Sequence, residues 1–316
     1  MNYVVRRGAT AIATLFAVAS LIFLLLHLVP GDPAEILLSS GGIAPSKESV
    51  EALRVNLGLD KPLLEQYITY LGNITTGNLG TSFQDGAPIG DEIVKRLPRT
   101  LELILAATFI SVLVGMPAGV AAALRRGGVI DGLCSSLASF GLSVPVFVTG
   151  TLLILLFSQI LRLVPAGGYV GFADNPAQHI VYLLLPAVSI AVGLIPVVFR
   201  MVRTSILEFL EKEWVRTARA KGLDEPRVLL LHVVRNSLSP VVTVLGLHMG
   251  TLLGGTVLVE YVFNWPGLSG MLVQAVEQRD YPAVQGIVLV ICLLFVLINL
   301  GVDLLYGMLD PRVRYK

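Results

Sequence analysis

The residues best placed to act on another molecule lie between Glu213 and Pro240, where a densely charged stretch separates two long apolar runs. Eight basic residues occur between Arg200 and Arg235. Ionisable side chains are costly inside a bilayer unless they are paired or reached by water. The stretch is therefore expected outside the membrane, on a face that another molecule contacts.

A short helix that ends at a glycine is predicted inside this stretch. Residues Glu208 to Lys221 have helical spacing, and Ala218 and Ala220 leave room for a partner to approach closely. Gly222 can take the left-handed conformation that ends a helix, and Pro226 prevents its continuation. The side chains expected to make polar contacts around the small residues are Arg216, Arg219 and Lys221.

The pattern Gly267-Leu268-Ser269-Gly270 is also typical of a different class of protein, the intramembrane serine proteases of the rhomboid type. In that class Ser269 would be the nucleophile and His248 its base. The order of the residues argues against that class, because the rhomboid pattern expects the base on a later span. The last apolar run contains no histidine, and Ser269 is expected in an outer loop. We therefore expect no catalytic residue in this chain.

Metal and cofactor sites have no support in the sequence. Cys134 and Cys292 lie in different apolar runs, with no C-x-x-C pattern and no Cys/His ligand spacing. The P-loop pattern G-x-x-x-x-G-K-[ST] is also missing, so any nucleotide chemistry must belong to another chain. We expect this chain to bind no metal, no cofactor and no nucleic acid.

The elements that must position these residues are apolar enough to be membrane spans. Of the 316 residues, 54% are hydrophobic and only 14% are charged, which is too apolar for an ordinary soluble domain. A helix that crosses the hydrocarbon core needs about 20 apolar residues. Six runs come near this length: Ala9–Val29, Leu101–Leu124, Leu133–Leu161, Ile180–Val202, Val241–Phe263 and Val284–Met308. The predicted fold is an all-α integral membrane protein with six transmembrane helices.

The predicted domain organisation follows from these runs. Residues 1–30 form the N-terminal tail and first span, and residues 31–99 form a polar insertion between spans 1 and 2. Residues 100–316 form a core of five spans, with the charged loop, about 204–238, between spans 4 and 5.

The distribution of charge predicts the orientation. An even number of spans puts both termini on one side, which also holds the charged loop and its excess of Lys and Arg. The insertion carries nine acidic and six basic residues. Both termini and the loop are therefore predicted to be cytoplasmic, and the insertion extracytoplasmic.

Two helices are predicted inside the insertion. Ser46 can cap a helix that runs to Gly58, with Glu48 and Glu51 in its first turn. A second helix is expected from Pro62 to Leu71, followed by a loop over residues 72–90.

Four patterns together resemble the ABC-importer permeases of the dipeptide and oligopeptide branch, the DppB/OppB-like family. Trp214 and the run Arg216-Thr217-Ala218-Arg219-Ala220-Lys221-Gly222, followed by Arg235-Asn236-Ser237-Leu238 and Pro240, resemble the EAA loop. The other matching segments are Pro30-Gly31-Asp32-Pro33, Val259–Leu268 and Asp310–Tyr315. Arg216 stands where many sugar permeases have glutamate, and Pro240 lies further along the chain from Gly222 than in the general importer motif. Both departures narrow the resemblance to the peptide branch.

The resemblance implies a transport subunit without catalytic activity, placed in a bacterial plasma (inner) membrane. Its implied partners are a second, homologous permease in a heterodimer, two ATP-binding-cassette ATPases and an extracytoplasmic binding protein that delivers a small peptide. The charged loop would couple the ATPases to the membrane through Trp214, Thr217 and the residues named above. Glutathione or a nickel or other metal chelate remains an alternative substrate, and a stand-alone secondary transporter would leave the charged loop without a role.

Two further groups of residues are candidates for helix packing or for the translocation pathway. Gly246, Gly250 and Gly254 place small residues on one face of the fifth span, as in small-xxx-small interfaces. We expect this face to contact the second permease, with packing inside one subunit as the alternative. Asn299 and Asp303 lie one turn apart in the sixth span, where they line the route or form hydrogen bonds between helices.

Overall fold

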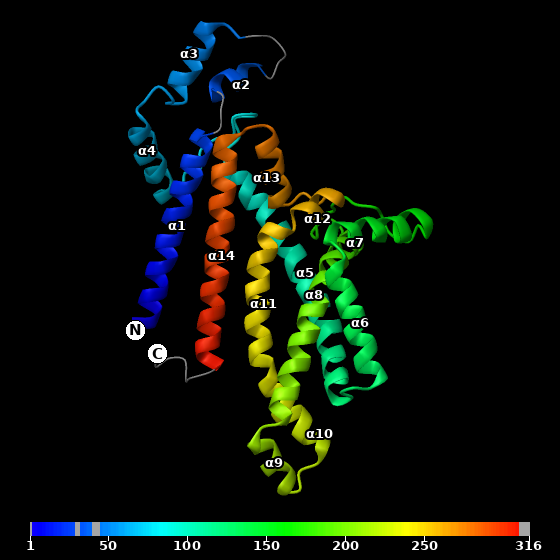
Figure 1. The fold of residues 1–316 in the computed structure, drawn as a ribbon. Coiled ribbons are helices and arrows are strands. Elements are labelled where there is room, and N and C mark those ends of the chain that lie inside the picture. Colours follow the sequence, from blue (N-terminus) through cyan, green and yellow to red (C-terminus); the bar gives the residue numbers. More distant parts are fainter. Residues whose placement is uncertain (1, 29–31, 40–44, 310–316) are drawn as a thin grey trace. The chain divides into compact units, whose positions relative to one another are not determined.

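The computed structural model describes residues 2–28, 32–39 and 45–309, whose regular structure is helical (Figure 1). The helices are α1 (Asn2–Leu28), α2 (Pro33–Ser39), α3 (Lys47–Asn56), α4 (Leu63–Thr75), α5 (Ile89–Leu124), α6 (Val129–Ser143), α7 (Val146–Leu153), α8 (Pro176–Leu210), α9 (Glu213–Ala220), α10 (Glu225–Arg227), α11 (Arg235–Gly255), α12 (Val257–Val262), α13 (Leu268–Glu277) and α14 (Tyr281–Leu309), with π-helical η1 (Ile154–Ile160) and η2 (Val228–Val234). The chain divides into two compact units, Met1–Pro98 with Met271–Leu294 and Arg99–Gly270 with Phe295–Lys316.

Five helical segments in the described part of the chain are long and apolar enough to cross a membrane, and a bent pair would make a sixth. The pair is α6 followed by α7 and η1, with an angle of 100° between them. The sequence predicts a span over the apolar run Leu133–Leu161, in which Pro145 can bend the helix, and the structure confirms a bend at this proline. The break lies at Val144, which is extended with φ −92° and ψ 123°, because a residue before proline is disfavoured in the helical region and Pro145 comes next.

The first unit brings the insertion onto two apolar helices. Ala19 and Ile22 of α1 are buried together with Leu289 of α14, and Tyr70 and Ile74 of α4 pack against them. The carboxylate of Asp280, also buried, accepts hydrogen bonds from Ser82 Oγ at 2.5 Å and Phe83 N at 3.2 Å. These contacts tie the loop before α5 to the turn before α14.

The helix predicted from Ser46 is confirmed. Ser46 Oγ accepts a hydrogen bond from Ser49 N at 3.2 Å, and Gly58 just past the end of α3 has φ +68°. The helix after Pro62 is also present, but α4 runs one turn beyond the predicted end at Leu71. The short helix α2 was not predicted. Pro30 and Gly31 of the family-like segment lie outside the described residues.

The second unit has an apolar core built around α8. Leu194, Val198 and Val202 of this helix are buried against Ala123 of α5 and Val241 of α11. Towards its N-terminus, α8 buries Leu185 and Ile190 in another cluster that includes Leu103 and Ala107 of α5. Thus α8 makes core contacts along most of its length, and its internal residues Pro186 and Pro196 do not end it.

Helices α5 and α8 approach closely at two glycines. A Cβ atom at Gly115 would lie 2.9 Å from the Ile195 carbonyl oxygen, and one at Gly119 would lie 2.8 Å from Val202 Cβ. Ser111, one turn earlier, is fully buried and donates its hydroxyl to Ala107 O at 2.7 Å. The face Ser111-Gly115-Gly119 is therefore a small-residue interface of the kind found between membrane helices.

Candidate functional site

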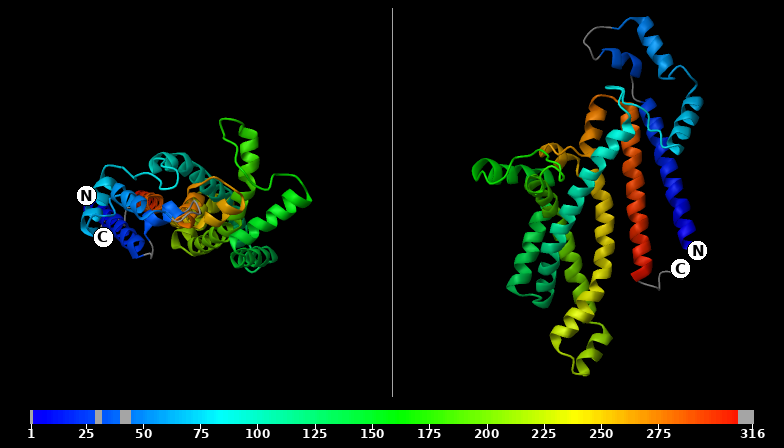
Figure 2. Two further views of the ribbon diagram at one scale, coloured as in Figure 1. Left: turned by 90° about the horizontal axis from the view of Figure 1, so that it is seen from above. Right: turned by 180° about the vertical axis from the view of Figure 1, so that it is seen from behind.

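The charged loop between α8 and α11 contains the candidate coupling helix, α9. Figures 1 and 2 show the loop projecting beyond the α5–α6 turn of the same unit. The prediction of one helix from Glu208 to Lys221 is wrong, because α8 ends at Leu210 and α9 begins at Glu213. Lys212 between them is extended, with φ −70° and ψ 143°.

Helix α9 is anchored to the core of its unit by one buried side chain. Val215 is fully buried, with 0% exposure, and belongs to the cluster that contains Ile206 of α8 and Val228 and Val233 of η2. Trp214, 38% exposed, lies between two rings of the same unit, with centroid distances of 6.2 Å to Phe209 and 6.3 Å to His232. An eight-residue helix is marginal by itself, so these contacts hold it in place.

The end of α9 has the geometry predicted for Gly222. This residue has φ +78°, and its N–H donates to Arg219 O at 2.9 Å. Leu223 N donates to Ala218 O at 3.3 Å. The two bonds form a Schellman motif, which ends the helix and satisfies its last carbonyl groups. Nothing lies within 4 Å of a Cβ placed at Gly222, so its backbone conformation, not lack of space, favours glycine.

The outer face of α9 is polar and accessible in the chain. Exposed side chains are Arg216, Thr217, Arg219, Ala220 and Lys221. Arg219 forms two hydrogen bonds to Glu225 of α10, at 3.1 and 2.6 Å, which raise the pKa of the guanidinium. Arg216 pairs with Glu213 at 3.2 Å. Of the two alanines expected to face a partner, only Ala220 is exposed, because Ala218 packs partly against the unit's own core.

The glycines of α11 face α14 of the same unit. A Cβ at Gly246 would overlap Val302 Cγ2, and one at Gly250 would lie 2.9 Å from the Phe295 ring. Gly254 has open space around it. Two of the three glycines therefore pack against a helix of the same subunit, which is the alternative to the expected contact with a second permease.

Of the two polar candidates in α14, Asn299 and Asp303, only the first has a described side chain. Asn299 donates its amide to Phe295 O, one turn earlier, at 2.8 Å. It also lies near Gly250, where an added Cβ would be 3.7 Å from Asn299 Nδ2. The side chain of Asp303 and the whole of Asp310–Tyr315 lie outside the described residues.

A second polar site surrounds Glu260. The position of this residue at the end of an apolar run predicts that its side chain reaches water, and that prediction is wrong, because Glu260 is 1% exposed. Its carboxylate accepts from Thr100 Oγ1 at 2.7 Å and from Gly270 N at 2.8 Å. Thr100 Oγ1 in turn accepts from Leu268 N at 2.8 Å. The carboxylate thus holds Leu268–Gly270, the first residues of α13, against Thr100 of α5, all within the second unit.

The loop between α12 and α13 is held by the same part of α5. Trp265 Nε1 donates to Arg99 O at 3.1 Å, and Gly168 N donates to Phe263 O at 2.8 Å. Arg99 lies over the Tyr169 ring at 4.5 Å from its centroid. These contacts join three separate segments of the second unit at one place.

Ser269, considered above as a nucleophile, belongs to the same junction. It is fully buried, and its hydroxyl donates to Leu253 O at 3.2 Å and lies 3.1 Å from Thr256 Oγ1. These partners are a backbone carbonyl and a second hydroxyl, neither of which can act as a general base. Ser269 is therefore a packing residue.

Two ionisable pairs, each with one buried member, were not singled out in the sequence. His179 is 1% exposed, with Nε2 at 2.5 Å from Glu102 Oε1 and Nδ1 at 2.6 Å from Val170 O. Asp131 of α6 receives two hydrogen bonds from Arg203 of α8, at 2.7 and 2.8 Å. No local pattern could reveal either pair, because their members are 77 and 72 residues apart.

Comparison with known proteins gives matches along the whole chain. Residues 115–315 match the family described as binding-protein-dependent transport system inner membrane component, and residues 1–104 match its N-terminal counterpart. The dipeptide transport system permease protein DppB of Escherichia coli strain K12 is 40% identical over 339 residues, covering 100% of this chain and 99% of the relative. The glutathione transport system permease protein GsiC of the same strain is 42% identical over 316 residues, with 100% of both covered.

A solved structure shares the fold at lower identity. It is the inward-facing MetNI methionine ABC transporter, with a TM-score of 0.58 and 18% identity over 69% of this chain and 96% of the matched chain. At this identity the similarity concerns the fold alone.

Proposed function

The chain belongs to the family of inner membrane components of binding-protein-dependent transport systems, and from that premise we propose how it works and what it carries. It is a multi-pass membrane permease of an ABC importer and not an enzyme. Our proposal is that it forms one half of a translocation pathway for short peptides, with a second homologous permease forming the other half. Two ATPases on the cytoplasmic side and an extracytoplasmic binding protein complete the importer.

The proposed topology has six spans, with the α6–α7–η1 pair as the third. Both termini and the α9–α10 loop are cytoplasmic, and residues 31–99 are extracytoplasmic. The concentration of Lys and Arg in the loop supports this orientation, because positive residues accumulate in cytoplasmic loops. In the second unit, α8 precedes the α9–α10 loop, and η2 and α11 follow it, as this topology requires.

Helix α9 is the proposed coupling helix. The observation that supports this role is how α9 is attached to its unit. Val215 is buried in a core shared with α8 and η2, while the opposite face of α9 is exposed. A force on the exposed face from an ATPase would therefore reach both flanking helices through close packing. The proposed contact residues are Arg216, Thr217, Ala220 and Lys221, with Trp214 at the edge.

The Glu260 junction has a proposed role at the other end of α11. Its hydrogen bonds join α12 to Thr100 of α5 and to Gly270 in the first turn of α13, all within the second unit. A junction that is buried and fully bonded keeps these segments together, so movement of α11 would carry them along instead of separating them. We propose that they move as one body when the pathway opens.

Peptides are the proposed substrate class because the match to the dipeptide permease covers the whole chain. Glutathione is the second candidate, favoured by the equally complete match to GsiC. Glutathione is itself a tripeptide, so both relatives point to ligands with peptide groups and free carboxylates. Import of a nickel or other metal chelate remains the alternative with least support.

The test is purification of the chain from its native membrane in mild detergent, followed by reconstitution and uptake. We expect a second permease and P-loop ATPases to copurify, and ATP-dependent uptake of a labelled dipeptide to require the binding protein. Competition by glutathione and by a nickel chelate ranks the substrate classes. Purification of the chain alone, with no associated ATPase, would contradict the importer assembly.

A further inference from the structure

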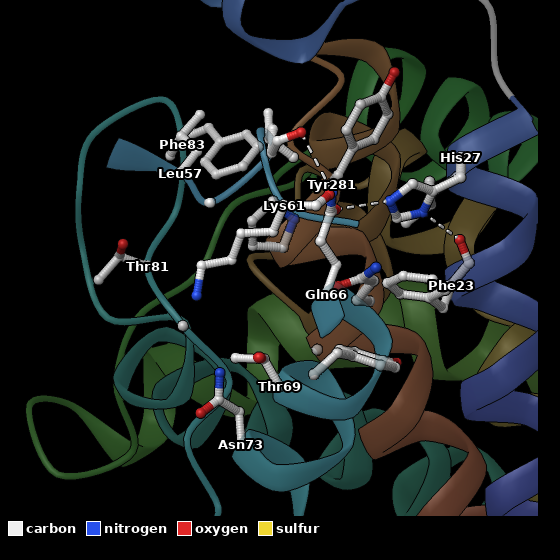
Figure 3. A pocket seen from close by; sticks show the side chains of 18 of the residues that line it. Phe23, His27, Leu57, Lys61, Gln66, Thr69, Asn73, Thr81, Phe83 and Tyr281 are labelled. Carbon is white, nitrogen blue, oxygen red and sulfur yellow. Dashed lines mark hydrogen bonds between the residues drawn. The ribbon is translucent and has the colours of Figure 1, made fainter. Parts of the chain in front are cut away.

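A cavity in the first unit has no part in the coupling or junction sites. Its walls come from the end of α1, from α3 and α4, from residues 78–83 and from the start of α14 (Figure 3). Its volume is about 990 Å³, at the upper end of the range of about 300–1,000 Å³ typical of small-molecule sites.

The walls combine apolar and amide-bearing side chains. Phe23 of α1 and Leu289 of α14 belong to the apolar part. The amide-bearing side chains are Asn56, Gln66, Asn73, Asn78 and Gln285. A side-chain amide can both donate and accept hydrogen bonds, as can a peptide group. Such a lining suits a ligand that presents peptide groups between apolar side chains.

The charges around the cavity are mixed in sign. Its ionisable lining residues include Arg54 and Lys61 against Asp32, Glu51 and Asp60. Arg54 is paired with Asp32, and Lys61 Nζ lies 2.8 Å from Glu65 Oε1. Figure 3 shows the Lys61 side chain reaching into the space near Thr81 and Thr69. Opposite charges at one cavity favour a zwitterion over a ligand with several negative charges, such as a lipid phosphate.

Two phenol groups in the walls lack hydrogen bonds to the protein. Among the described residues, the hydroxyl groups of Tyr70 and Tyr281 are buried without a partner, and both tyrosines line the cavity. Leaving a buried polar group unbonded is unfavourable. Burial raises the pKa of Tyr70 to about 12. Both hydroxyl oxygens are sealed from solvent within the wall, so the polar groups open to a ligand are the side-chain amides. Gln66, by contrast, is already bonded to His27 at 3.2 Å and to Lys61 O at 2.8 Å.

We propose that this cavity binds a free short peptide in its zwitterionic form, as a peptide site on the permease itself. The peptide backbone bonds the amide side chains, its carboxylate lies towards Lys61 and an apolar side chain packs on the α1 and α14 wall. The choice of a peptide rests on the proposed function, since the same lining would also accept other zwitterions that carry amide groups. All the residues that line the site belong to the first unit.

The experiment measures binding of the dipeptide alanyl-phenylalanine to the full-length chain with its copurifying subunits in lipid nanodiscs, without the binding protein. Isothermal titration should show saturable binding. Asn73→Trp, which places a large ring at the cavity wall, should weaken binding by about tenfold or more. Ile68→Trp is the matched control, because Ile68 lies on the same helix, is exposed and does not line the cavity. It should leave the affinity unchanged.

A second pair of measurements does not depend on tolerance of a bulky residue. Gln285→Leu removes an amide group from the cavity lining and keeps the side chain close to its original size, so dipeptide affinity should fall while the amount of assembled complex stays the same. The same dipeptide with an acetylated N-terminus and an amidated C-terminus, which lacks both charges, should bind more weakly. If the wild-type chain binds no dipeptide, or if both Asn73→Trp and Gln285→Leu bind it normally, the proposal is overturned.

Uptake by the complete importer separates this inference from the proposed function. Dipeptide uptake without any binding to the chain would overturn the cavity site and leave the importer function intact. Dipeptide binding that is sensitive to Asn73→Trp, in an importer that transports no peptide, would overturn the peptide-importer function and leave the site. If Asn73→Trp weakens only the affinity for the binding protein, the cavity receives that protein and not a free peptide, which also overturns the proposal.

Discussion

At the scale of single residues, three glycines illustrate different physical constraints. Gly222 is required for its backbone angle, with φ +78° and open space around it. Gly267 is required for space, because its Cβ would overlap Glu260 Oε1. Gly270, in the same junction, has neither constraint, since its Cβ would meet Glu260 Oε2 at an ordinary 3.7 Å. A substitution at each position should therefore have a different effect.

Replacing Gly222 by valine should uncouple transport while leaving the protein inserted. A β-branched residue at positive φ costs about 1–2 kcal/mol or more, which would disturb the end of α9 and the position of its exposed face. ATP-dependent uptake and substrate-stimulated ATPase activity should both fall, with normal amounts of protein in the membrane. Gly222→Asn is the control, because asparagine tolerates this conformation, and it should keep most activity. Equal activity of the two variants would remove the role assigned to this turn.

Replacing Gly267 by alanine should destabilise the Glu260 junction. The added methyl group must push aside a buried carboxylate that holds two hydrogen bonds, and overpacking of this kind costs about 1–3 kcal/mol. Gly270→Ala adds the same methyl group three residues later at no steric cost. A thermal melt of the purified complex should therefore show a lower transition for Gly267→Ala than for Gly270→Ala. Identical melting temperatures would mean that the junction relaxes easily.

At the scale of elements, the α5–α8 contact and the coupling helix depend on opposite features. The α5–α8 pair relies on Gly115 and Gly119 for close approach. Helix α9 is short and polar and relies on one buried anchor, Val215. Long apolar helices can pack through small residues, whereas a short polar helix needs a hydrophobic contact to be held in place.

The α5–α8 contact predicts that alanine at Gly119 is destabilising in spite of its better helix propensity. Its Cβ would lie 2.8 Å from Val202 Cβ and 2.9 Å from Phe199 O, so the helices must separate. Gly132→Ala in α6 is the matched control, because nothing lies within 4 Å of that position and alanine favours a helix over glycine by about 0.8–1 kcal/mol. Thermal melts should move in opposite directions for the two variants. A rise for both would show that the helices tolerate a wider spacing.

At the scale of the whole molecule, the chain is one subunit of the proposed importer. It lacks a P-loop pattern, and its proposed work is to transmit movement between an ATPase and a pathway shared with a second permease. This role predicts contacts with other chains at defined places, and those contacts can be tested directly.

A cysteine at Ala220 should crosslink to an ATPase subunit. Ala220 is exposed on the outer face of α9, and the chain's own Cys134 and Cys292 can be replaced by alanine beforehand. A bifunctional thiol–amine reagent should join Ala220→Cys to a P-loop ATPase, with a yield that changes on addition of ATP. The control is Thr75→Cys at the exposed end of α4, which the proposed topology places on the other side of the membrane. Crosslinking from Thr75→Cys and not from Ala220→Cys would reverse the orientation.

The sequence by itself determined the features that depend on local composition and spacing. The apolar runs identified the membrane helices, and the Ser46 cap and the glycines at 58 and 222 marked helix ends, because capping and positive φ are properties of a few neighbouring residues. The resemblance of the charged loop identified the family. These signals require no knowledge of which segments meet in space.

Only the tertiary structure decided which polar groups are buried and which small residues are in contact. The side chain of Glu260 was wrongly predicted to reach water, because its partners, Thr100 and Gly270, lie on other segments. The pairing of His179 with Glu102 likewise has no local signal in the sequence. The separation of α9 from α8 was missed because a continuous helical pattern does not show how far each helix packs against its neighbours. Burial is a property of packing between distant segments, so it becomes visible only when those segments are brought together.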